Sequence, residues 1–412
     1  MHGHLLRLIN KTYAFDLTYR PNFFKLSDPL QKEKFQTLLN CEGLLVYDKI
    51  IDQVKELIKT RHPEKKLTID EISLLAEKEF KGQTHDEFGV WVFYPWTNKL
   101  IHILDQPQFI ELRTNRNLYK ITIEERNRLS TKIVGVVGLS VGQSVALTMA
   151  TERTFGEIRI ADHDNLDLSN LNRIRSGLHN IGLSKVIITA REISEIDPFL
   201  KVTCFHEGIH SNNIDSFFLE GGKLDVLIEE CDSVDIKILA REKAKKYGIP
   251  VIMEASDRGT VDIERFDLEK DRPIFHGNVI NVSSEYLRGL SNEEKIPYIL
   301  PIAGIDTLSP RMKASMMEVG KTIYTWPQLA SAVVLGGAIA ADIYRRIVLN
   351  QLQISGRFFI DLEELICDAP NDNFPFLNNI LKKSTINNNF AKHSSLTIIE
   401  SCICIVKNTS GL

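Results

Sequence analysis

A single stretch, residues 132–185, restricts the possible folds more than any other part of the chain. It opens with Ile133–Val137, an apolar run without polar interruption, which is typical of a strand buried on both faces of a parallel sheet. Gly138, Ser140 and Gly142 then form a turn of small residues that leads into an apolar helix. A strand, a glycine turn and a helix N-terminus together present backbone N–H groups and the positive end of a helix dipole. The stretch therefore predicts a phosphate-binding site.

The second strand of this stretch ends in a carboxylate. Ile158–Ala161 is followed by Asp162, which lies 24 residues after Gly138. In dinucleotide-type folds a carboxylate at about this place binds the ribose hydroxyls, so Asp162 is the candidate for that contact. The glycine turn alone is a weak signal, because Ser140 and Gln143 stand where a full G-x-G-x-x-G motif has glycines. A tight turn without a ligand, and a capping role for Asp162, stay open as alternatives.

Strand-like and helix-like segments alternate between residues 151 and 260. Alternation at this spacing predicts right-handed βαβ crossovers and an α/β fold, a Rossmann-like mostly parallel sheet with helices on both faces. Ligands of such sheets bind beyond the carboxyl ends of the strands. The glycine turn, Asp162 and Asp232 each follow a predicted strand, so we expect them at the same edge of the sheet.

Three short motifs follow Asp162 in a fixed order: Ser169–Arg173 (SNLNR), Gly182–Lys185 (GLSK) and Ile196–Pro198 (IDP). Together they closely resemble the ThiF/MoeB/HesA family of ubiquitin-activating-type adenylyltransferases, over roughly residues 113–350. The resemblance implies an enzyme that uses ATP and Mg²⁺ to convert a carboxylate into an acyl-adenylate, with release of pyrophosphate. It also implies that the carboxylate belongs to the C-terminus of a ubiquitin-like or sulfur-carrier protein, or of a peptide.

Polar and charged side chains on separate loops fit the needs of this chemistry. Asn170, Arg173 and Lys185 would neutralise charge on the phosphate chain, beside the backbone amides that follow Gly138. The resemblance assigns Mg²⁺ binding to Asp232, and Mg²⁺ prefers one or two carboxylates together with phosphate oxygens. No general base is required, because a carboxylate is already ionised at neutral pH. A structural ion pair for Arg173 and a solvated position for Lys185 are the alternatives.

An arginine-containing element precedes the first strand of the sheet. Arg113 and Arg116 keep the spacing of the family's RYxRQ element, whereas Thr114 and Asn117 depart from it. In many relatives one such arginine reaches across a dimer interface to the triphosphate. The resemblance therefore makes Arg116 a catalytic candidate and predicts a homodimer. A solvated arginine in a charged linker is the alternative.

Three other functions stay open beside adenylation of a protein or peptide. A dehydratase-type relative would activate a carboxylate on modified tRNA, although a chain without a basic patch is a poor nucleic-acid binder. An NAD-binding oxidoreductase shares the strand–turn–helix start, but SNLNR and Lys185 favour ATP. A catalytically inactive nucleotide-binding subunit of a larger assembly is the last possibility. Transfer to a cysteine is also open, with Cys231 beside the predicted metal site and Cys367, Cys402 and Cys404 far along the chain. The four-cysteine zinc site common in many relatives is absent, because the sequence has no C-x-x-C pair.

Composition narrows the class of protein and its compartment. The chain has 412 residues, a net charge of −4 and six cysteines without even spacing. Such cysteine usage indicates a reducing compartment, and we expect a cytoplasmic protein. No run of about 18 apolar residues is present, which predicts no membrane span.

The chain divides into three predicted regions. Residues 1–112 form an α+β accessory module with helices near 31–39, 49–59 and 68–80 and a hairpin between 88 and 104. The ThiF-type adenylation domain covers 113–365, with an irregular region at 268–325 and a long helix at 326–349. The extension 366–412 holds a predicted asparagine-rich loop at 371–389 and a strand-like segment at 396–406.

Overall fold

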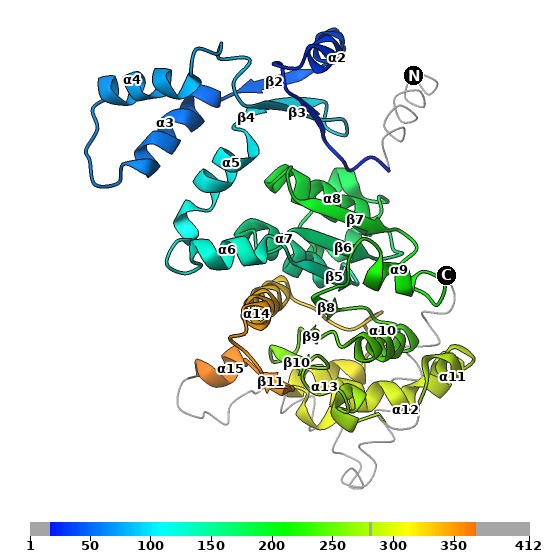
Figure 1. Cartoon of the computed structure of the whole chain (residues 1–412). Coiled ribbons are helices and arrows are strands. Elements are labelled where there is room, and N and C mark those ends of the chain that lie inside the picture. Colours follow the sequence, from blue (N-terminus) through cyan, green and yellow to red (C-terminus); the bar gives the residue numbers. More distant parts are fainter. Residues whose placement is uncertain (1–16, 280–281, 368–412) are drawn as a thin grey trace, which may run out of the picture. The chain divides into compact units, whose positions relative to one another are not determined.

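The computed structural model describes residues 17–279 and 282–367 (Figure 1). The predicted loop at 371–389 and strand at 396–406 lie outside the described residues. Contacts divide the chain into two compact units. The small unit comprises Met1–Thr131, Ala150–Gly156 and Ile187–Val202, and the large unit comprises Lys132–Met149, Glu157–Val186 and Thr203–Leu412.

The small unit contains a four-stranded sheet with the strand order β1-β3-β4-β2. β3 and β4 form the predicted antiparallel hairpin, and α4 begins with the predicted capping box between Thr68 and Glu71. The α+β character expected of this region is therefore confirmed. Its elements are β1 (Asn22–Phe24), α2 (Pro29–Leu39), β2 (Leu45–Asp48), α3 (Ile50–Arg61), α4 (Ile69–Phe80), β3 (Val90–Tyr94), β4 (Lys99–Ile103), α5 (Gln106–Arg113), η1 (Asn115–Asn117) and α6 (Ile123–Leu129).

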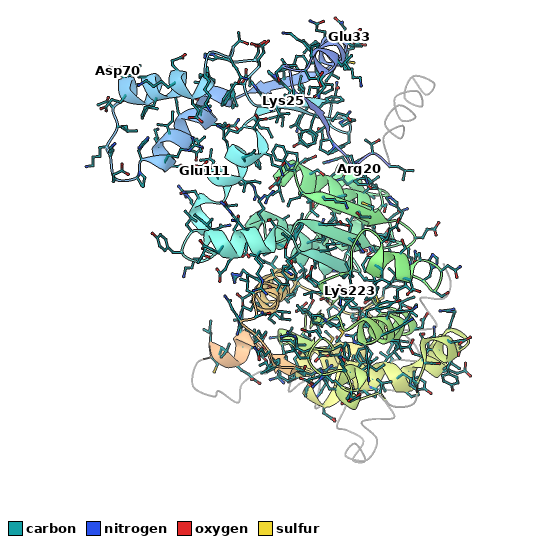
Figure 2. All side chains as sticks on the ribbon, in the orientation of Figure 1. Arg20, Lys25, Glu33, Asp70, Glu111 and Lys223 are labelled. Atoms are coloured by element: carbon teal, nitrogen blue, oxygen red, sulfur yellow. The ribbon has the colours of Figure 1, made fainter. Side chains whose placement is uncertain are left out.

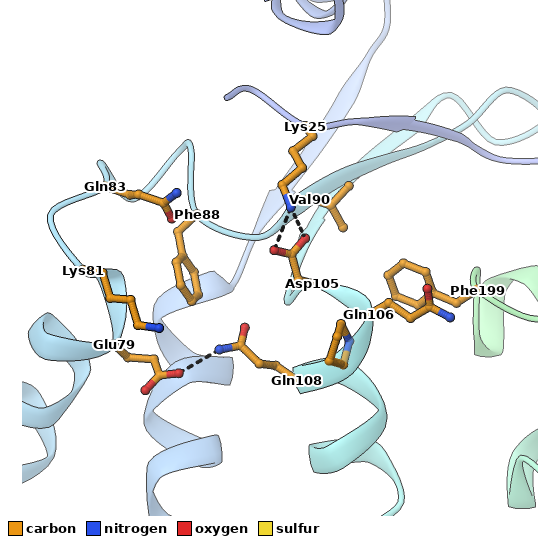
Figure 3. A pocket seen from close by; sticks show the side chains of 11 residues that line it. Lys25, Glu79, Lys81, Gln83, Phe88, Val90, Asp105, Gln106, Gln108 and Phe199 are labelled. Carbon is orange, nitrogen blue, oxygen red and sulfur yellow. Dashed lines mark hydrogen bonds and ion pairs between the residues drawn. The ribbon is translucent and has the colours of Figure 1, made fainter. Parts of the chain in front are cut away.

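A pocket of about 620 Å³ lies in the small unit, between α4 and the starts of β3 and α5 (Figure 3). Its charged groups are largely paired with one another. Lys25 Nζ lies 3.0 Å from a carboxylate oxygen of Asp105, and Glu79 accepts hydrogen bonds from Gln108 and Arg61. The pocket therefore offers no surface of a single charge sign, and none of the predicted site residues lines it.

A seven-stranded sheet has the strand order β11-β10-β9-β8-β5-β6-β7. β5 pairs in parallel with β6 and β8, and β8 with β9, whereas β10 is antiparallel to β9 and β11. The elements of this part of the chain are β5 (Ile133–Val137), α7 (Gly142–Glu152), β6 (Glu157–Ala161), η2 (Leu168–Asn172), η3 (Leu178–Asn180), α8 (Lys185–Ile196), β7 (Lys201–Phe205), α9 (Ile214–Leu219), β8 (Val226–Glu229), α10 (Val234–Tyr247), β9 (Val251–Ala255), β10 (Thr260–Glu264), η4 (Ile274–Gly277), α11 (Ser284–Arg288), α12 (Asn292–Ala303), η5 (Ile305–Thr307), α13 (Pro310–Met316), α14 (Ala330–Val348), β11 (Gly356–Phe359) and α15 (Leu362–Leu365).

Helices cover both faces of this sheet (Figure 1). On one face, Leu227 of β8 belongs to a buried apolar cluster that includes residues of α9 and α10. On the opposite face, Val136 of β5 lies against the first residue of α7, and Glu254 of β9 lies against α14. α14 also packs on α7, because an added Cβ at Gly337 would fall 2.3 Å from Ser144 Oγ. The predicted Rossmann-like, mostly parallel sheet with helices on both faces is confirmed.

The region 268–325 is not irregular, so that prediction was wrong. It contains α11, α12 and α13, and each helix begins after a serine whose hydroxyl accepts a hydrogen bond from a backbone N–H of the first turn. The prolines in α12 and α13 made these two helices hard to predict, because a proline inside a helical pattern normally marks a helix end. Pro310 instead occupies the favourable first turn of α13, and Pro297 and Pro301 lie within α12.

The long helix α14 begins at Ala330, four residues later than predicted. Pro327 explains the difference, because the residue before a proline is disfavoured in the helical region. Leu329 is still extended, with φ −110° and ψ 140°. Within 17–279 and 282–367, no helix combines the length and the apolarity that a membrane crossing demands.

Candidate active site

The site lies where the strand order of the sheet changes direction. From β5 the chain proceeds to β6 and β7 on one side and to β8 and β9 on the other. Loops at the carboxyl ends of the two central strands separate at such a point and leave a crevice, where open α/β sheets bind ligands. Gly138 follows β5, and Asp232 lies three residues after the end of β8. The two predicted groups therefore follow adjacent parallel strands at the same edge of the sheet.

Gly138 is required at this point by space and by backbone conformation. Its φ is +85°, and an added Cβ would fall 2.6 Å from the backbone nitrogen of Cys231 and the carbonyl oxygen of Glu230. Gly142, the first residue of α7, has a similar restriction, because its Cβ would meet Val136 Cγ1 at 2.7 Å. The glycine turn is thus packed tightly between β5 and the loop after β8.

Asp162 holds the glycine turn in place. One carboxylate oxygen accepts a hydrogen bond from Leu139 N–H at 2.6 Å, and the other accepts one from Asp164 N–H at 2.8 Å. Asp162 is only 7% exposed. Both oxygens thus already accept hydrogen bonds from backbone groups. The contact of Asp162 with a ribose stays a prediction. The sequence contains a signal that Asp162 holds the glycine turn: Asp162 follows β6, and β6 lies next to β5, which precedes the turn.

Arg173 lies directly against the glycine turn. Its Nε donates to Ser140 Oγ at 2.9 Å, and its Nη1 donates to Asn172 Oδ1 at 2.9 Å. Burial lowers the pKa of Arg173, and the negative charge of Asp232 opposes that decrease. The structure therefore brings together two predicted residues, Ser140 and Arg173, that lie 33 positions apart in the chain.

Positive charges, including two that the sequence predicts for this site, act on the carboxyl group of Asp232. Desolvation by the surrounding protein raises the pKa of its carboxyl group, and the charges of Lys237, Lys185 and Arg173 oppose the increase. The side chain nevertheless reaches solvent. Asp164 adds a second negative charge and acts in the same direction as desolvation. The electrostatic field at Asp232 thus combines three cations and one further carboxylate.

Lys185 is held by a residue that sequence reasoning left outside the site. Its Nζ lies 2.7 Å from Asp164 Oδ2, and its side chain is largely buried at the start of α8. Asp164 was not among the candidates predicted from the sequence. The available signal is that Asp164 follows Asp162 with one residue between them, directly after β6. Asp164 belongs with the candidate site residues.

Two predicted residues do not join this cluster by any contact within the described parts of the chain. Asn170 accepts a hydrogen bond from Asp167 N–H at 3.1 Å through its side chain, so it stabilises the turn that carries Arg173. Arg116 is an exposed residue of η1 in the small unit. The proposed reach of Arg116 to a triphosphate stays a prediction.

A buried ionic cluster fixes the loop that carries Asp232. Glu229, the last residue of β8, lies 3.1 Å from Lys237 Nζ and 2.5 Å from Arg241 Nη1. Arg241 also contacts Glu264 at 2.6 Å. Although burial acts to raise it, the pKa of Glu229 is lowered to about 2 by Lys237 and Arg241. Lys237 therefore stabilises the loop after β8 through its ion pair with Glu229.

Cys231 is a poor candidate for a nucleophile. Burial raises the pKa of its thiol well above the usual value, and the charge of Glu229 acts in the same direction. Its Sγ donates to Glu229 Oε1 at 2.9 Å. Because the thiolate is the reactive form of cysteine, this environment keeps Cys231 unreactive at neutral pH.

The side chains suit Mg²⁺ bound through phosphate rather than a closed protein cage. Among the described residues, Asp162, His163 and Asp164 form the one group of three close metal-ligand side chains, and Asp232 is not part of it. Asp232 offers a single solvent-reaching carboxylate beside Arg173 and Lys185. Mg²⁺ is commonly held by one or two carboxylates, water and substrate phosphates, so this arrangement fits.

Comparison with known proteins identifies the family. The model of the ThiF family matches residues 112–360, which is more than half of the chain. The chain belongs to the ThiF family. The ThiF match covers the glycine turn, Asp162, Arg173, Lys185 and Asp232.

The names of the relatives of this chain state different activities, and one states none. MT1398, an uncharacterized protein of Mycobacterium tuberculosis, is 45% identical over 277 residues, 67% of this chain and 38% of its own length. The tRNA threonylcarbamoyladenosine dehydratase of Bacillus subtilis is 27% identical over 155 residues, 37% of this chain and 60% of that protein. The ubiquitin-like modifier-activating enzyme 5 of Drosophila willistoni is 32% identical over 136 residues, 31% of this chain and 34% of that protein. The chain thus spans less than two thirds of the length of each.

Proposed function

We propose that this site adenylates a carboxylate with ATP and releases pyrophosphate. One observation carries the proposal: Arg173 donates to Ser140 in the glycine turn, and the charges of Arg173 and Lys185 both act on the carboxyl group of Asp232, which follows β8. Two cations and a carboxylate near the N-terminus of α7 match a magnesium-bound triphosphate better than they match an uncharged cofactor. Membership of the ThiF family supports the same conclusion, because one relative of this chain is named for activating a ubiquitin-like modifier.

The chain's own groups would divide the work of binding and charge neutralisation. Backbone N–H groups at the start of α7 would bind phosphate oxygens, with the positive end of the helix dipole behind them. Arg173 would present its remaining donors to the phosphate chain while Ser140 and Asn172 hold its plane. Lys185 would add a second positive charge. Asp164, which is more exposed than Asp162, would share the contact with the ribose hydroxyls while it holds Lys185.

The chemical step needs no proton transfer. A carboxylate oxygen of the acyl substrate attacks the α-phosphorus of ATP and forms the acyl–phosphate bond. The bond from the α-phosphorus to the bridging oxygen breaks, and that oxygen leaves with pyrophosphate. Mg²⁺, held by Asp232, would supply further charge neutralisation on the phosphates. Arg173 and Lys185 would stabilise the charge that moves onto the leaving group.

We propose a protein or peptide C-terminus as the acyl substrate, and a homodimer as the functional assembly. A relative named for a ubiquitin-like modifier supports the substrate class, and a relative named for a tRNA dehydratase provides the competing class. The dimer follows from Arg116, which would complete the triphosphate site of a second copy. Nothing in the composition favours nucleic acid, because the net charge is −4.

ATP–pyrophosphate exchange tests the proposed function. Purified protein with MgATP, labelled pyrophosphate and candidate acyl substrates should exchange label into ATP only when a carboxylate substrate is present. Asp232→Asn should abolish the exchange, whereas Asp271→Asn, an exposed residue in the same unit, should leave it intact. Binding of NAD without binding of ATP would refute adenylation and favour an oxidoreductase. ATP binding without exchange on any substrate would favour a catalytically inactive subunit.

A further inference from the structure

The segment of residues 324–329, which immediately precedes α14, is fixed at both ends within the large unit. Trp326 packs against a buried cluster that contains Ile296 of α12 and Met316 of α13. At the other end, α14 is pressed onto α7 where Gly337 meets Ser144. The helix that starts at the glycine turn and the helix that ends this segment are therefore in direct contact.

Asn172 connects this segment to the candidate active site. Its Nδ2 donates to the backbone carbonyl of Gln328 at 2.8 Å, across 156 positions of the chain. Its Oδ1 accepts from Arg173 Nη1 at 2.9 Å. Arg173 in turn donates to Ser140 at 2.9 Å. Three consecutive hydrogen bonds thus join the 324–329 segment to the glycine turn.

Asparagine is suited to this place because its amide has both a donor and an acceptor. The acceptor serves a guanidinium group, and the donor serves a carbonyl group. An aspartate would keep the contact with Arg173 but lose the donor, and its charge would repel the carbonyl oxygen of Gln328. A leucine of similar shape would lose both bonds. The two contacts of Asn172 can therefore be separated by mutation.

We propose that Asn172 is a positioning residue that couples nucleotide binding at Arg173 to the 324–329 segment. When phosphate oxygens engage Arg173, its guanidinium plane is fixed, Asn172 is fixed with it, and the carbonyl of Gln328 is held. The coupling is reciprocal. If ATP changes the affinity of a partner for the segment by some factor, that partner changes the affinity for ATP by the same factor. This inference rests on the proposed function, since it takes Arg173 to be a phosphate ligand.

The exposed side chains of the segment indicate what the coupling serves. Leu329 is 68% exposed, although it is a large apolar residue. It lies one residue from the carbonyl that Asn172 binds. In the proposed reaction, the acyl substrate must approach the phosphate chain near Arg173. ATP binding would then fix the conformation of residues 324–329 before the acyl substrate binds. This favours an ordered mechanism in which ATP binds first and the acyl substrate second.

Hydrogen exchange on the full chain tests the coupling. In the wild type, MgATP should slow amide exchange in peptides that cover 322–331 by at least about threefold, since the opening of a bonded segment limits its exchange. Asn172→Asp, which keeps the contact with Arg173, should still bind ATP with less than about a tenfold loss of affinity, but the effect on 322–331 should disappear. Asn172→Leu, which loses both bonds, should bind ATP more weakly and should also lose the effect on 322–331. Gln328→Ala is the matched control, because the bond uses its backbone carbonyl and should persist.

The outcomes separate the coupling from the proposed function. Wild-type protein that binds ATP without any change in 322–331 overturns the coupling and leaves adenylation standing. Asn172→Asp protein that keeps the ATP effect also overturns it, because the donor is then not needed. Loss of all ATP binding in both Asn172 variants would make Asn172 a binding residue and refute the positioning role. Wild-type protein that binds no ATP overturns the proposed function and this inference together.

Discussion

At the scale of single residues, Arg173 makes the most specific contacts in the site. Its planar guanidinium group binds Ser140 and Asn172 at once, and a lysine ammonium cannot reproduce that geometry. We expect Arg173→Lys to reduce ATP–pyrophosphate exchange strongly, and Arg173→Ala to reduce it by about 10³-fold, the lower end for arginines in phosphoryl transfer. Initial rates at saturating MgATP provide the measurement. Equal rates in wild type and Arg173→Ala would remove Arg173 from the mechanism.

Glu254 predicts an unusual dependence of stability on pH. It is 4% exposed, and neither carboxylate oxygen has a hydrogen-bond partner among the described residues. Burial raises its pKa from 4.5 to about 8. The folded state therefore binds this proton more tightly than the unfolded state, and stability should fall as pH rises from about 4.5 to about 8.

Thermal unfolding of Glu254→Gln tests that dependence. The variant should show a smaller decrease in stability between pH 5 and pH 8, because glutamine stays neutral. Part of the decrease should remain, because burial also raises the pKa of the neighbouring Glu230 well above its usual value. Glu33→Gln is the control, since Glu33 is exposed on α2 (Figure 2) and should follow the wild type. Parallel curves for wild type and Glu254→Gln across this range would show that Glu254 is charged in the folded protein.

At the scale of elements, the contact between α14 and α7 depends on the absence of a side chain. An added Cβ at Gly337 would lie 2.9 Å from the backbone carbon of Ser144. We expect Gly337→Ala to cost about 1–3 kcal/mol in overpacking, although alanine is intrinsically better than glycine in a helix. Chemical denaturation measures the loss. Ala338→Ser, at the exposed neighbouring position, should change stability by less than about 0.5 kcal/mol.

The elements of the sheet could be read from the sequence, whereas several of the contacts could not. Ile133–Val137 and the segments after it alternate regularly, so periodicity was sufficient for the strands. The helices α12 and α13 were missed because prolines stand where pattern rules place helix ends, and α11 has only five residues. The bond from Asn172 to Gln328 spans 156 residues, and no local pattern encodes a contact of that kind.

At the scale of the whole molecule, the proposed dimer predicts complementation between inactive variants. If Arg116 acts on the site of the second copy, Arg116→Ala and Arg173→Ala are each inactive as homodimers. Mixed dimers would contain one site with neither substitution and one site with both. Mixing the two proteins with exchange of subunits should therefore restore ATP–pyrophosphate exchange to at most about a quarter of the wild-type rate, for random pairing of subunits with one intact site in each mixed dimer. Failure to restore any exchange would place Arg116 in the same copy as the site it serves, whereas an active Arg116→Ala homodimer would place it outside the reaction.

The hydrogen bond from Leu139 to Asp162 has a consequence for the kinetics of nucleotide capture. The turn is already shaped when no nucleotide is present, because Asp162 holds it and Gly138 is packed against the backbone after β8. Little conformational freedom is left to lose on association, so a slow rearrangement should not limit the encounter. Different nucleotides should then differ in their dissociation rate constants rather than in their association rate constants.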